Sequence, residues 1–389
     1  MHPIDYLQQL VDNHEIAGAA LRIRKGGELL VDQCVGWADI ENQVPVTADT
    51  MFRLASMTKP IVGLATMQLV EQGKLCLDDP IETYLPAFRD MLVAVVPEGG
   101  NPYIQVPTPE MMAGLKLENA KRPVTIGMLL SHSSGIGHGP ISTALGAPVL
   151  DFTSLERGVA QLSHLPLDFH PGEGTGYSAF AAFDIMGRII EVVSGETLED
   201  YFANHIFKPL DITDMGFLLN DEQRSRLSHT YEYTEDKTLV DTSDNNTIAM
   251  VSADRHGYFC GGGGLIGSLN AYDRIAQMYL NGGSLDGVQL LKPETVQLMA
   301  TPYYDRNPMP GFHWGLSMGV YDGVGKGRWM GPNSFGWSGA LGTHFYADRA
   351  NELCVTMMIS RSNLLGVINY IYLAVEEAIY KTFIDPSAE

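Results

Sequence analysis

Cysteine is scarce in this chain, and the few cysteines show no pairing pattern. Four occur among 389 residues, far apart and mostly in apolar surroundings, without a Cys-x-x-Cys spacing: Cys34, Cys76, Cys260 and Cys354. Disulfide-dense domains contain many cysteines, and zinc sites typically use closely spaced ones. We therefore expect buried free thiols, with neither disulfides nor a bound metal.

Basic residues are also few. The chain has 25 Lys and Arg against 46 Asp and Glu, which gives a formal net charge of −21. A field of this sign repels the phosphates of nucleic acids and the anionic headgroups of membranes. The expected partner is a small molecule, with no nucleic acid and no membrane surface; the oligomeric state stays open.

Long apolar runs are missing. Stretches such as Met91–Val96 and Ile61–Val70 fall well short of the about 20 residues that span a bilayer, so no transmembrane segment is expected. The first residues, Met1–Tyr6, lack the basic and apolar regions of a signal peptide. We expect a cytoplasmic protein.

Two common site motifs are absent as well. The chain contains neither the G-x-x-x-x-G-K-[ST] phosphate loop nor the H-E-x-x-H zinc pair. The groups around Gly137, Gly174 and Gly325 lack the spacing of a dinucleotide-binding turn and are interpreted as ordinary turns. No cofactor and no metal are expected.

The residues that are present predict a folded protein of mixed secondary structure. Hydrophobic residues make up 45% and charged residues 18% of the chain, which excludes disorder for most of it. Hydrophobic periodicity predicts a helix and a hairpin at each chain end: Ile4–Asn13, Ala19–Arg24 and Glu28–Val35, then His344–Asp348, Leu353–Ile359 and Leu365–Thr382. Between the ends it predicts mainly helices: Ser56–Gln72, Thr125–Ser131, Leu155–Leu162, Ala179–Val193, Leu198–His205 and Ala271–Leu280.

This order favours an α+β fold in which both chain ends contribute to one antiparallel sheet. Helices would flank the sheet, because its apolar face must be covered. The expected lobes are residues 1–80 with 255–389, which contain the sheet, and residues 81–254, which are mainly helical. The active site would lie between them, and the turn-rich segment 98–109 would form a surface loop at its border.

Gly315–Gly319 matches the G-x-S-x-G pattern of α/β-hydrolases, with Asp322 and His344 following in triad order. An elbow serine lies on a turn between a strand and a helix. Here a glycine-rich stretch follows instead of a helical pattern, so Ser317 is interpreted as an ordinary strand serine.

Ser56 and Lys59 form a more informative pair. At the start of a helix, residues three apart lie on one face, so the hydroxyl and the amine can meet near the positive end of the helix dipole. Pro60 is tolerated in a first turn, and Gly73 provides a stop. Serine followed by lysine three residues later is common by chance, so the context has to decide.

That context consists of segments in a fixed order along nearly the whole chain. They include Phe52–Pro60, Gly73–Pro80, Tyr84–Pro86, Thr125–Gly135, Pro171–Gly172, Tyr177–Ser178, Val193–Glu196, Lys208–Leu210, Gly261–Leu265 and Phe335–Ala340. Together they resemble the serine β-lactamase and penicillin-recognising superfamily, most closely its class C-like family VIII carboxylesterases.

The resemblance implies a β-lactamase-like fold and assigns roles to individual residues. Ser56 would be the acylated nucleophile, Lys59 a general base and Tyr177 a proton relay. The backbone N–H groups of Ser56 and Ala340 would form the oxyanion hole, with Trp337, Ser338 and Gly339 lining the substrate site. These roles agree with physical chemistry, since a serine needs a base to become a good nucleophile.

Two departures from the β-lactamase pattern bear on the substrate. The β-lactamases carry Tyr-x-Asn in the second motif, whereas this chain has Ala179 in the third position. Their Lys-Thr-Gly motif is replaced by Trp337–Gly339, the W-x-G form of the esterases. A substrate carboxylate would therefore lack its partner, and burying it unpaired would be costly.

Other polar and apolar residues fit ordinary structural roles. His132 and His138 have no indicated acid partner, so they are not expected to form a triad with Ser131 or Ser133. Met111, Met112 and Trp314 are as consistent with a core as with a pocket.

The sequence thus predicts a cofactor-independent serine hydrolase that cleaves small carboxylic esters through an acyl-enzyme. The alternatives are a β-lactamase, a D-amino-acid peptidase or an acyltransferase on the same scaffold, or a non-catalytic penicillin-binding-like protein. The natural substrate and its acyl chain length stay open.

Overall fold

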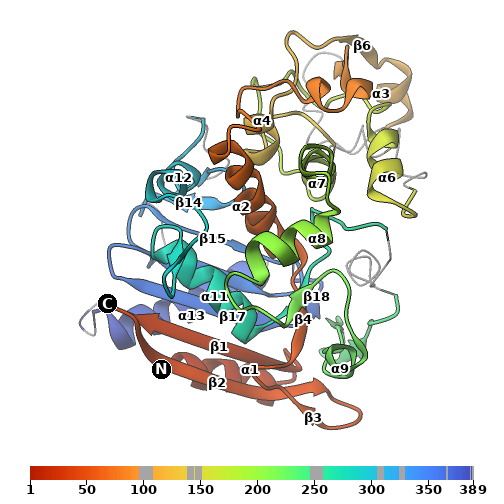
Figure 1. Ribbon diagram of the computed structural model, residues 1–389. Coiled ribbons are helices and arrows are strands. Elements are labelled where there is room, and N and C mark those ends of the chain that lie inside the picture. Colours follow the sequence, from red (N-terminus) through yellow and green to blue (C-terminus); the bar gives the residue numbers. More distant parts are fainter. Residues whose placement is uncertain are drawn as a thin grey trace.

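The computed structural model contains a broad antiparallel sheet built from both chain ends, with helices on both of its faces (Figure 1). The strands follow one another across the sheet in the order β13 (Phe312–Trp314), β14 (Gly319–Tyr321), β15 (Ser334–Ser338), β16 (His344–Asp348), β17 (Leu353–Ile359), β1 (Gly18–Lys25), β2 (Glu28–Asp39) and β3 (Val44–Pro45). Every neighbouring pair is antiparallel. The structure describes residues 1–95, 108–137, 144, 151–245, 257–304, 311–323, 329–364, 367–385 and 387.

The central strand β1 is buried on both faces, which explains its nearly continuous apolar sequence. Ala19, Leu21 and Ile23 pack in one cluster with α1 (Pro3–Asp12) and α13 (Val367–Phe383). Ala20 belongs to the cluster on the opposite face, where α11 (Leu269–Leu280) covers the sheet. The expectation of one sheet formed by both chain ends and covered by helices is confirmed.

A second group of helices lies beside the sheet in Figure 1, next to α2 (Thr58–Glu71). It consists of α4 (Ile126–Leu130), α6 (Leu155–Leu162), α7 (Ala181–Ser194) and α8 (Leu198–Phe202), which continues into a π-helical turn at Ala203–Phe207. Every residue of α2 up to Leu69 is buried, so α2 is the central helix of the fold. Its nearly uniform apolarity predicts this position.

Small elements connect these layers. The short sheets are β4 (Met51–Arg53) with β10 (Ile266–Ser268) and β7 (Met215–Gly216), β18 (Arg361–Ser362) with β8 (Tyr231–Tyr233) and β9 (Leu239–Asp241), β5 (Leu92–Val95) with β6 (Lys116–Asn119), and β11 (Ser284–Leu285) with β12 (Val288–Gln289). The short helices are η1 (Ala55–Met57), η2 (Ile81–Thr83), η3 (Pro86–Phe88), α3 (Pro109–Ala113), α9 (Asp221–Ser225) and α12 (Pro293–Met299).

Two of these small sheets attach residues 215–241 to β10 and β18. β7 pairs with β10, and β8 pairs in parallel with β18. This segment was expected in the helical lobe, yet its strands bond to strands of the sheet lobe. The lobe boundaries themselves stay a prediction, and the loop 98–109 lies outside the described residues except for its last two positions.

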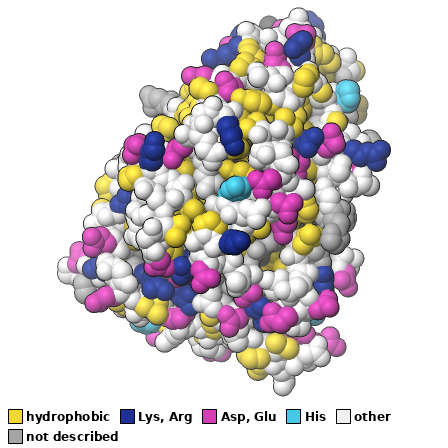
Figure 2. Space-filling model, viewed as in Figure 1, with side chains coloured by type: hydrophobic (Ala, Val, Ile, Leu, Met, Phe, Trp, Pro, Cys, Tyr) yellow, Lys and Arg dark blue, Asp and Glu magenta, His cyan; other side chains and the backbone are white. Residues whose placement is uncertain are grey.

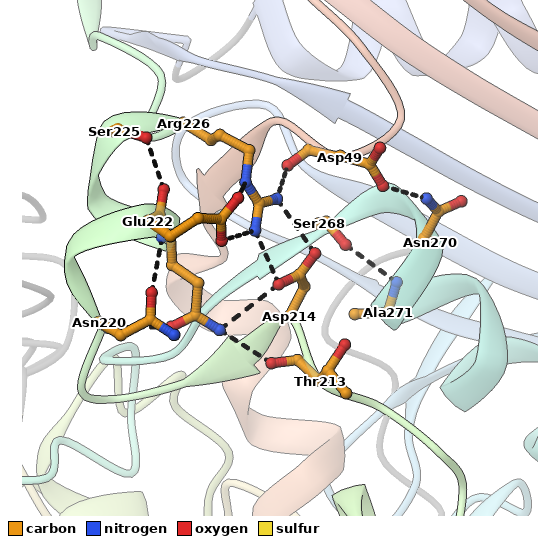
Figure 3. A network of polar contacts seen from close by, with 11 residues as sticks. Asp49, Thr213, Asp214, Asn220, Glu222, Ser225, Arg226, Ser268, Asn270 and Ala271 are labelled. Atoms are coloured by element: carbon orange, nitrogen blue, oxygen red, sulfur yellow. Dashed lines mark hydrogen bonds and ion pairs between the residues drawn. The ribbon is translucent and has the colours of Figure 1, made fainter.

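A polar network holds the segment around α9 against the strands that lead to Ser56 (Figure 3). The Arg226 guanidinium contacts Glu222 and Asp214, with nitrogen–oxygen distances of 2.7 and 2.9 Å, and donates to the Asp49 carbonyl. The hydrogen bonds that Arg226 donates to these two carboxylates raise its pKa. Asn220 adds a capping box to α9. The network fixes the approach to β4, which ends three residues before Ser56.

The acidic excess is spread over the surface, with basic side chains interspersed, as Figure 2 shows for one face. No helix in the described part of the chain is both long and apolar enough to cross a membrane. All four cysteines are free thiols, as expected. Cys260 and Cys354 are buried, but Cys34 is only partly buried and Cys76 is exposed, so the expectation of burial was wrong for these two. Cys76 lies just beyond the end of α2, where the chain returns to the surface.

Candidate active site

Ser56 occupies the η1 turn that leads into α2. The residue before it, Ala55, has φ of 47°, a left-handed conformation that costs a non-glycine residue about 1 kcal/mol or more. The surrounding chain holds this conformation: the Leu54 N–H donates to the Leu265 carbonyl (2.9 Å), and the Leu265 N–H donates to Thr58 Oγ1 (3.1 Å). The strained turn leaves the Ser56 side chain partly exposed at the start of a buried helix.

The three residues that the resemblance assigns to catalysis meet at one point. Ser56 Oγ lies 2.6 Å from the Tyr177 hydroxyl oxygen and 3.1 Å from Lys59 Nζ. Lys59 Nζ also donates to the carbonyl oxygens of Ala179 and Gly262, each at 2.6 Å. Serine, tyrosine and lysine are therefore linked by direct hydrogen bonds, over which a proton can move without large displacements.

Lys59 is fully buried. Its amine lies 5.1 Å from the centre of the Tyr177 ring and 5.3 Å from that of Phe183. Three oxygen acceptors and two aromatic faces fix the position of Nζ. Since the long side chain has no freedom left, the amine stays within reach of the Ser56 hydroxyl.

His132 holds Tyr177 in place from both sides. Its carbonyl accepts a hydrogen bond from the Gly176 N–H (2.9 Å), and its Nδ1 accepts one from the Ser178 N–H (3.2 Å). Burial, with a smaller effect from Lys59, lowers the pKa of His132 well below its usual 6.5. A neutral ring is required here, because a protonated Nδ1 has no lone pair to accept with.

Aromatic rings form a wall around this point. The Trp314 ring is stacked on Tyr177, with centroids 5.9 Å apart, and Trp337 lies 5.8 Å from Tyr177. The ring centroids of His132 and Trp314 lie 4.4 Å apart, and Phe312 packs edge-on against Trp314. The surroundings of Ser56, Lys59 and Tyr177 are thus mainly apolar and aromatic.

The end of β15 passes beside η1, where the resemblance places the third motif. The Gly339 N–H donates to the Thr343 carbonyl, and Thr343 Oγ1 donates to the Leu54 carbonyl (3.0 Å). A Cβ atom on Gly339 would lie only 2.4 Å from that carbonyl oxygen, so only glycine allows this approach. Ala340 follows in an exposed turn, and within the described chain no hydrogen bond involves its N–H. This position suits the predicted oxyanion-hole role, which stays a prediction.

Ser338 and Trp337 have different surroundings. Trp337 packs among the aromatic rings at the catalytic group, whereas Ser338 Oγ lies 2.9 Å from His344 Nδ1 on the opposite strand. The His344 ring is stacked on Tyr372 of α13, with centroids 4.2 Å apart. Neighbouring strand residues point to opposite faces. The hydroxyl of Ser338 is therefore directed to the α13 side, and only its backbone borders the predicted substrate site.

Ser317 is fully buried, so its surroundings do not suit a nucleophile that must reach a substrate. It lies in the turn between β13 and β14 with φ of 64°, so its interpretation as a strand serine was wrong. Its hydroxyl donates to the Leu316 carbonyl (2.6 Å) and packs against α2 at Gly63. Asp322 contacts His313, His344 contacts Ser338, and the Ser317 hydroxyl bonds to its own neighbour, so Ser317 lacks the base that the apparent triad requires.

The remaining expected residues also have structural surroundings. Ser131 Oγ donates to the Gly127 carbonyl and lies 2.9 Å from Ser133 Oγ, with no histidine contact among the hydrogen bonds of these described residues. His138 lies outside the described residues. The role of His132 could not be predicted, although the segment Thr125–Gly135 that contains it was recognised, because its hydrogen bonds reach a distant segment.

Comparison with known proteins places this geometry in a family. The sequence model of the family described as "Beta-lactamase" matches residues 4–375. The chain belongs to the beta-lactamase family. It is 31% identical to Protein Rv1367c of Mycobacterium tuberculosis, over 93% of this chain and 90% of that protein. It is 29% identical to Esterase EstB of Burkholderia gladioli, over 96% and 93% of the two chains.

A solved structure agrees with this assignment. EstCE1, described as a hydrolase with promiscuous acyltransferase activity, aligns with a TM-score of 0.80 at 24% identity, covering 97% of both chains. At this identity the likeness shows the fold, and the predicted β-lactamase-like fold is confirmed. With its family and relatives, the protein is a serine hydrolase of the β-lactamase fold.

Proposed function

We propose that this protein is a serine carboxylesterase that cleaves small, neutral carboxylic esters through an acyl-enzyme. The observation that carries the proposal is the contact of Ser56 Oγ with both Tyr177 (2.6 Å) and Lys59 (3.1 Å), beside Trp337 in the third motif. The relative named Esterase EstB supports the ester as substrate class.

The contacts suggest how the proton moves. Ser56 Oγ attacks the ester carbonyl while its proton passes to the neutral Lys59 amine, directly or through the Tyr177 hydroxyl. The carbon–oxygen bond to the alcohol then breaks, and the alcohol leaves with that proton, so that an acyl group remains on Ser56. Water then attacks the acyl carbonyl and gives a proton to the same base. The bond from the acyl carbon to Ser56 Oγ breaks, Oγ takes the proton back, and the free acid leaves.

The negative charge on the carbonyl oxygen needs donors during both steps. The N–H groups of Ser56 and Ala340 are proposed for this role, since Gly339 brings the exposed Ala340 turn against the chain just before Ser56. Removing one such donor from a hydrolase typically costs about 100- to 1000-fold in kcat.

The preference for neutral esters is supported by what surrounds Lys59. In the second motif, the backbone carbonyl of Ala179 accepts a hydrogen bond from the Lys59 amine. The alanine side chain offers no amide to a substrate. In the third motif, Trp337 is buried among Trp314, His132 and Tyr177. An aromatic wall favours apolar acyl groups, whereas an anionic substrate would lose water without gaining a partner.

Transfer of the acyl group to an alcohol other than water is a second candidate activity. The chain is 29% identical over 76% of its length to Monacolin J acid methylbutanoyltransferase of Aspergillus terreus. The same acyl-enzyme serves both reactions, and only the acceptor differs. Adding short alcohols during ester hydrolysis and measuring the new ester against the free acid decides between them.

We also propose a cytoplasmic location, on the evidence of the cysteines. All four are free, and Cys76 is exposed, which suits a reducing compartment better than an oxidising one. Fractionation of the source cells with detection by antibody tests this: recovery outside the cytoplasm contradicts it.

The substrate class is tested by kcat/KM for p-nitrophenyl butyrate and for the cephalosporin nitrocefin, together with labelling by a fluorescent penicillin. An esterase turns over the butyrate and is labelled weakly or not at all. Preference for nitrocefin indicates a β-lactamase instead, and labelling without turnover of either substrate indicates a penicillin-binding protein without catalysis.

A further inference from the structure

Asp184 is a buried acid that the mechanism described so far does not use. It lies in α7 between Phe183 and Ile185, and only 3% of it is exposed. Its Oδ2 accepts a hydrogen bond from the Tyr258 hydroxyl (2.6 Å), and its Oδ1 accepts one from the Gly262 N–H (3.1 Å). Burying a carboxylate in an apolar core is expensive, so a specific role is needed to explain it.

Gly262 connects this acid to the catalytic lysine. Its N–H donates to Asp184, while its carbonyl accepts the 2.6 Å hydrogen bond from Lys59 Nζ. A Cβ atom on Gly262 would lie 2.5 Å from the Phe180 Cα, so this residue is pressed against the start of α7. The position of the Gly262 carbonyl, and with it one of the three contacts of Lys59, therefore depends on Asp184.

The groups that face Lys59 come from four parts of the chain. They are Ser56 on η1, His132 after α4, Tyr177 just before α7, Asp184 within α7, and Cys260 in the loop before β10. Burial keeps two of them uncharged, since it lowers the pKa of His132 and raises that of Cys260. Of these described groups, Asp184 is the one carboxyl.

Two opposing effects act on the Asp184 carboxyl. Burial is the larger and raises its pKa, whereas hydrogen bonds from Tyr258, Gly262 and Cys260 and the charge of Lys59 lower it. Three donors directed at one carboxyl group are the pattern expected around an ionised form, because a protonated carboxyl would itself need an acceptor.

We infer that Asp184 is a positioning residue for Lys59: it fixes the Gly262 carbonyl against the amine and places a balancing negative charge behind it. The inference rests on the proposed function, in which Lys59 must lose its proton before Ser56 can react. A nearby negative charge favours the protonated amine. Asp184 therefore stabilises the protonated amine and holds it in place before the proton is lost.

The test replaces the carboxylate by neutral side chains, the isosteric Asp184→Asn and the smaller Asp184→Ser. For each, the rate at which a fluorophosphonate probe labels Ser56 is measured from pH 5 to 10, along with kcat/KM for p-nitrophenyl butyrate. Thermal unfolding shows which variants fold, and either neutral variant that folds is sufficient. Tyr258→Phe is the matched control, because it removes a hydrogen bond from the same acid and keeps the charge.

We expect the acid limb of both pH profiles to move about one unit towards lower pH in the neutral variants, the shift typical of losing one nearby opposite charge. At a pH on that limb, one unit corresponds to about tenfold more of the active form relative to the plateau. The control should keep its midpoint or move it slightly upwards. A lower plateau alone would not support the inference, since any misplacement of Lys59 lowers it.

Unchanged midpoints in the folded neutral variants contradict the inference, and so does an equal downward shift in Tyr258→Phe, which would show that lost packing and not lost charge is responsible. Failure of the proposed function gives a different result. A wild-type protein that the probe labels at Ser56 but that hydrolyses no ester refutes the esterase, while the labelling profiles still decide the role of Asp184.

Discussion

Ser56 and Ser317 have opposite surroundings. Ser56 contacts Lys59 and Tyr177, whereas Ser317 is buried and donates to its neighbour's carbonyl. Ser56→Ala should therefore lower kcat/KM for p-nitrophenyl butyrate by several orders of magnitude without changing the melting temperature. Ser317→Ala should retain most of the activity. Substantial hydrolysis by the Ser56 variant, or its near-complete loss in the Ser317 variant, would overturn the assignment.

His132 gives a prediction for the pH dependence of stability. Its pKa is far below 6.5 in the folded protein and near 6.5 in the unfolded chain, so below pH 6.5 the unfolded state binds one more proton. Stability should be unaffected by this group above pH 6.5 and should fall as the pH drops below it, by about 1.4 kcal/mol per unit.

The matched variant is His132→Asn, which keeps an acceptor near the Nδ1 position but does not titrate. Urea unfolding at pH 7.5 and 5.5 measures how much free energy of unfolding is lost between the two pH values. This loss should be about 1.4 kcal/mol smaller in the variant than in the wild type, the amount for the one pH unit below 6.5. Equal losses in the two proteins would mean that His132 is protonated in the folded state.

At the scale of elements, α2 packs closely against the turn between β13 and β14. A Cβ atom on Gly63 would lie 1.7 Å from Ser317 Oγ and 2.7 Å from its Cβ. Gly63→Ala should destabilise the protein by about 1–3 kcal/mol through overpacking. Adding Ser317→Gly removes both atoms and suits the positive φ at that position, so the double variant should recover much of the loss. Additive losses in a double-mutant cycle would show that the two elements do not press on one another.

Under the proposed function, the second and third motifs together set a preference for neutral ester substrates. Ala179→Asn restores the amide of the β-lactamases, and Trp337→Lys restores a cation. Each alone fixes one end of an anionic ligand, and a lysine against the aromatic wall is itself costly, so the double variant should change kcat/KM most in favour of nitrocefin over p-nitrophenyl butyrate. An unchanged ratio in all four proteins would mean that other parts of the pocket set the preference.

For the whole molecule, local patterns predict the elements well, and long-range contacts explain what was missed. The periodicity of Ile4–Asn13 and the glycine turn at Gly26 predict α1 and β1 to within one residue at each end, whereas β2 continues four residues beyond the predicted Val35. The surroundings of Ser338 could not be predicted, because they depend on which face of β15 meets α13. Asp184 was missed for a similar reason, since its partners are more than 70 residues away.

The site followed the same rule. Ser56 and Lys59 are three residues apart, so helical geometry predicts their contact, whereas Tyr177 is 121 residues from Ser56 and was assigned by resemblance alone. The His132 hydrogen bonds that position Tyr177 also cross distant segments. Spacing therefore predicts the contact of Ser56 with Lys59, and only the fold brings Tyr177 to these two residues.

The most direct test of the account is to find where the acyl group goes. The protein is mixed with p-nitrophenyl butyrate, quenched in acid within its first turnovers, digested and analysed by mass spectrometry. The acyl-enzyme mechanism predicts that the peptide containing Ser56 carries a butyryl group in place of one proton and is therefore about 70 mass units heavier. The same peptide from a Ser56→Ala protein should carry none. The mechanism would be contradicted if the Ser56→Ala protein stayed active and still carried a butyryl group on another residue.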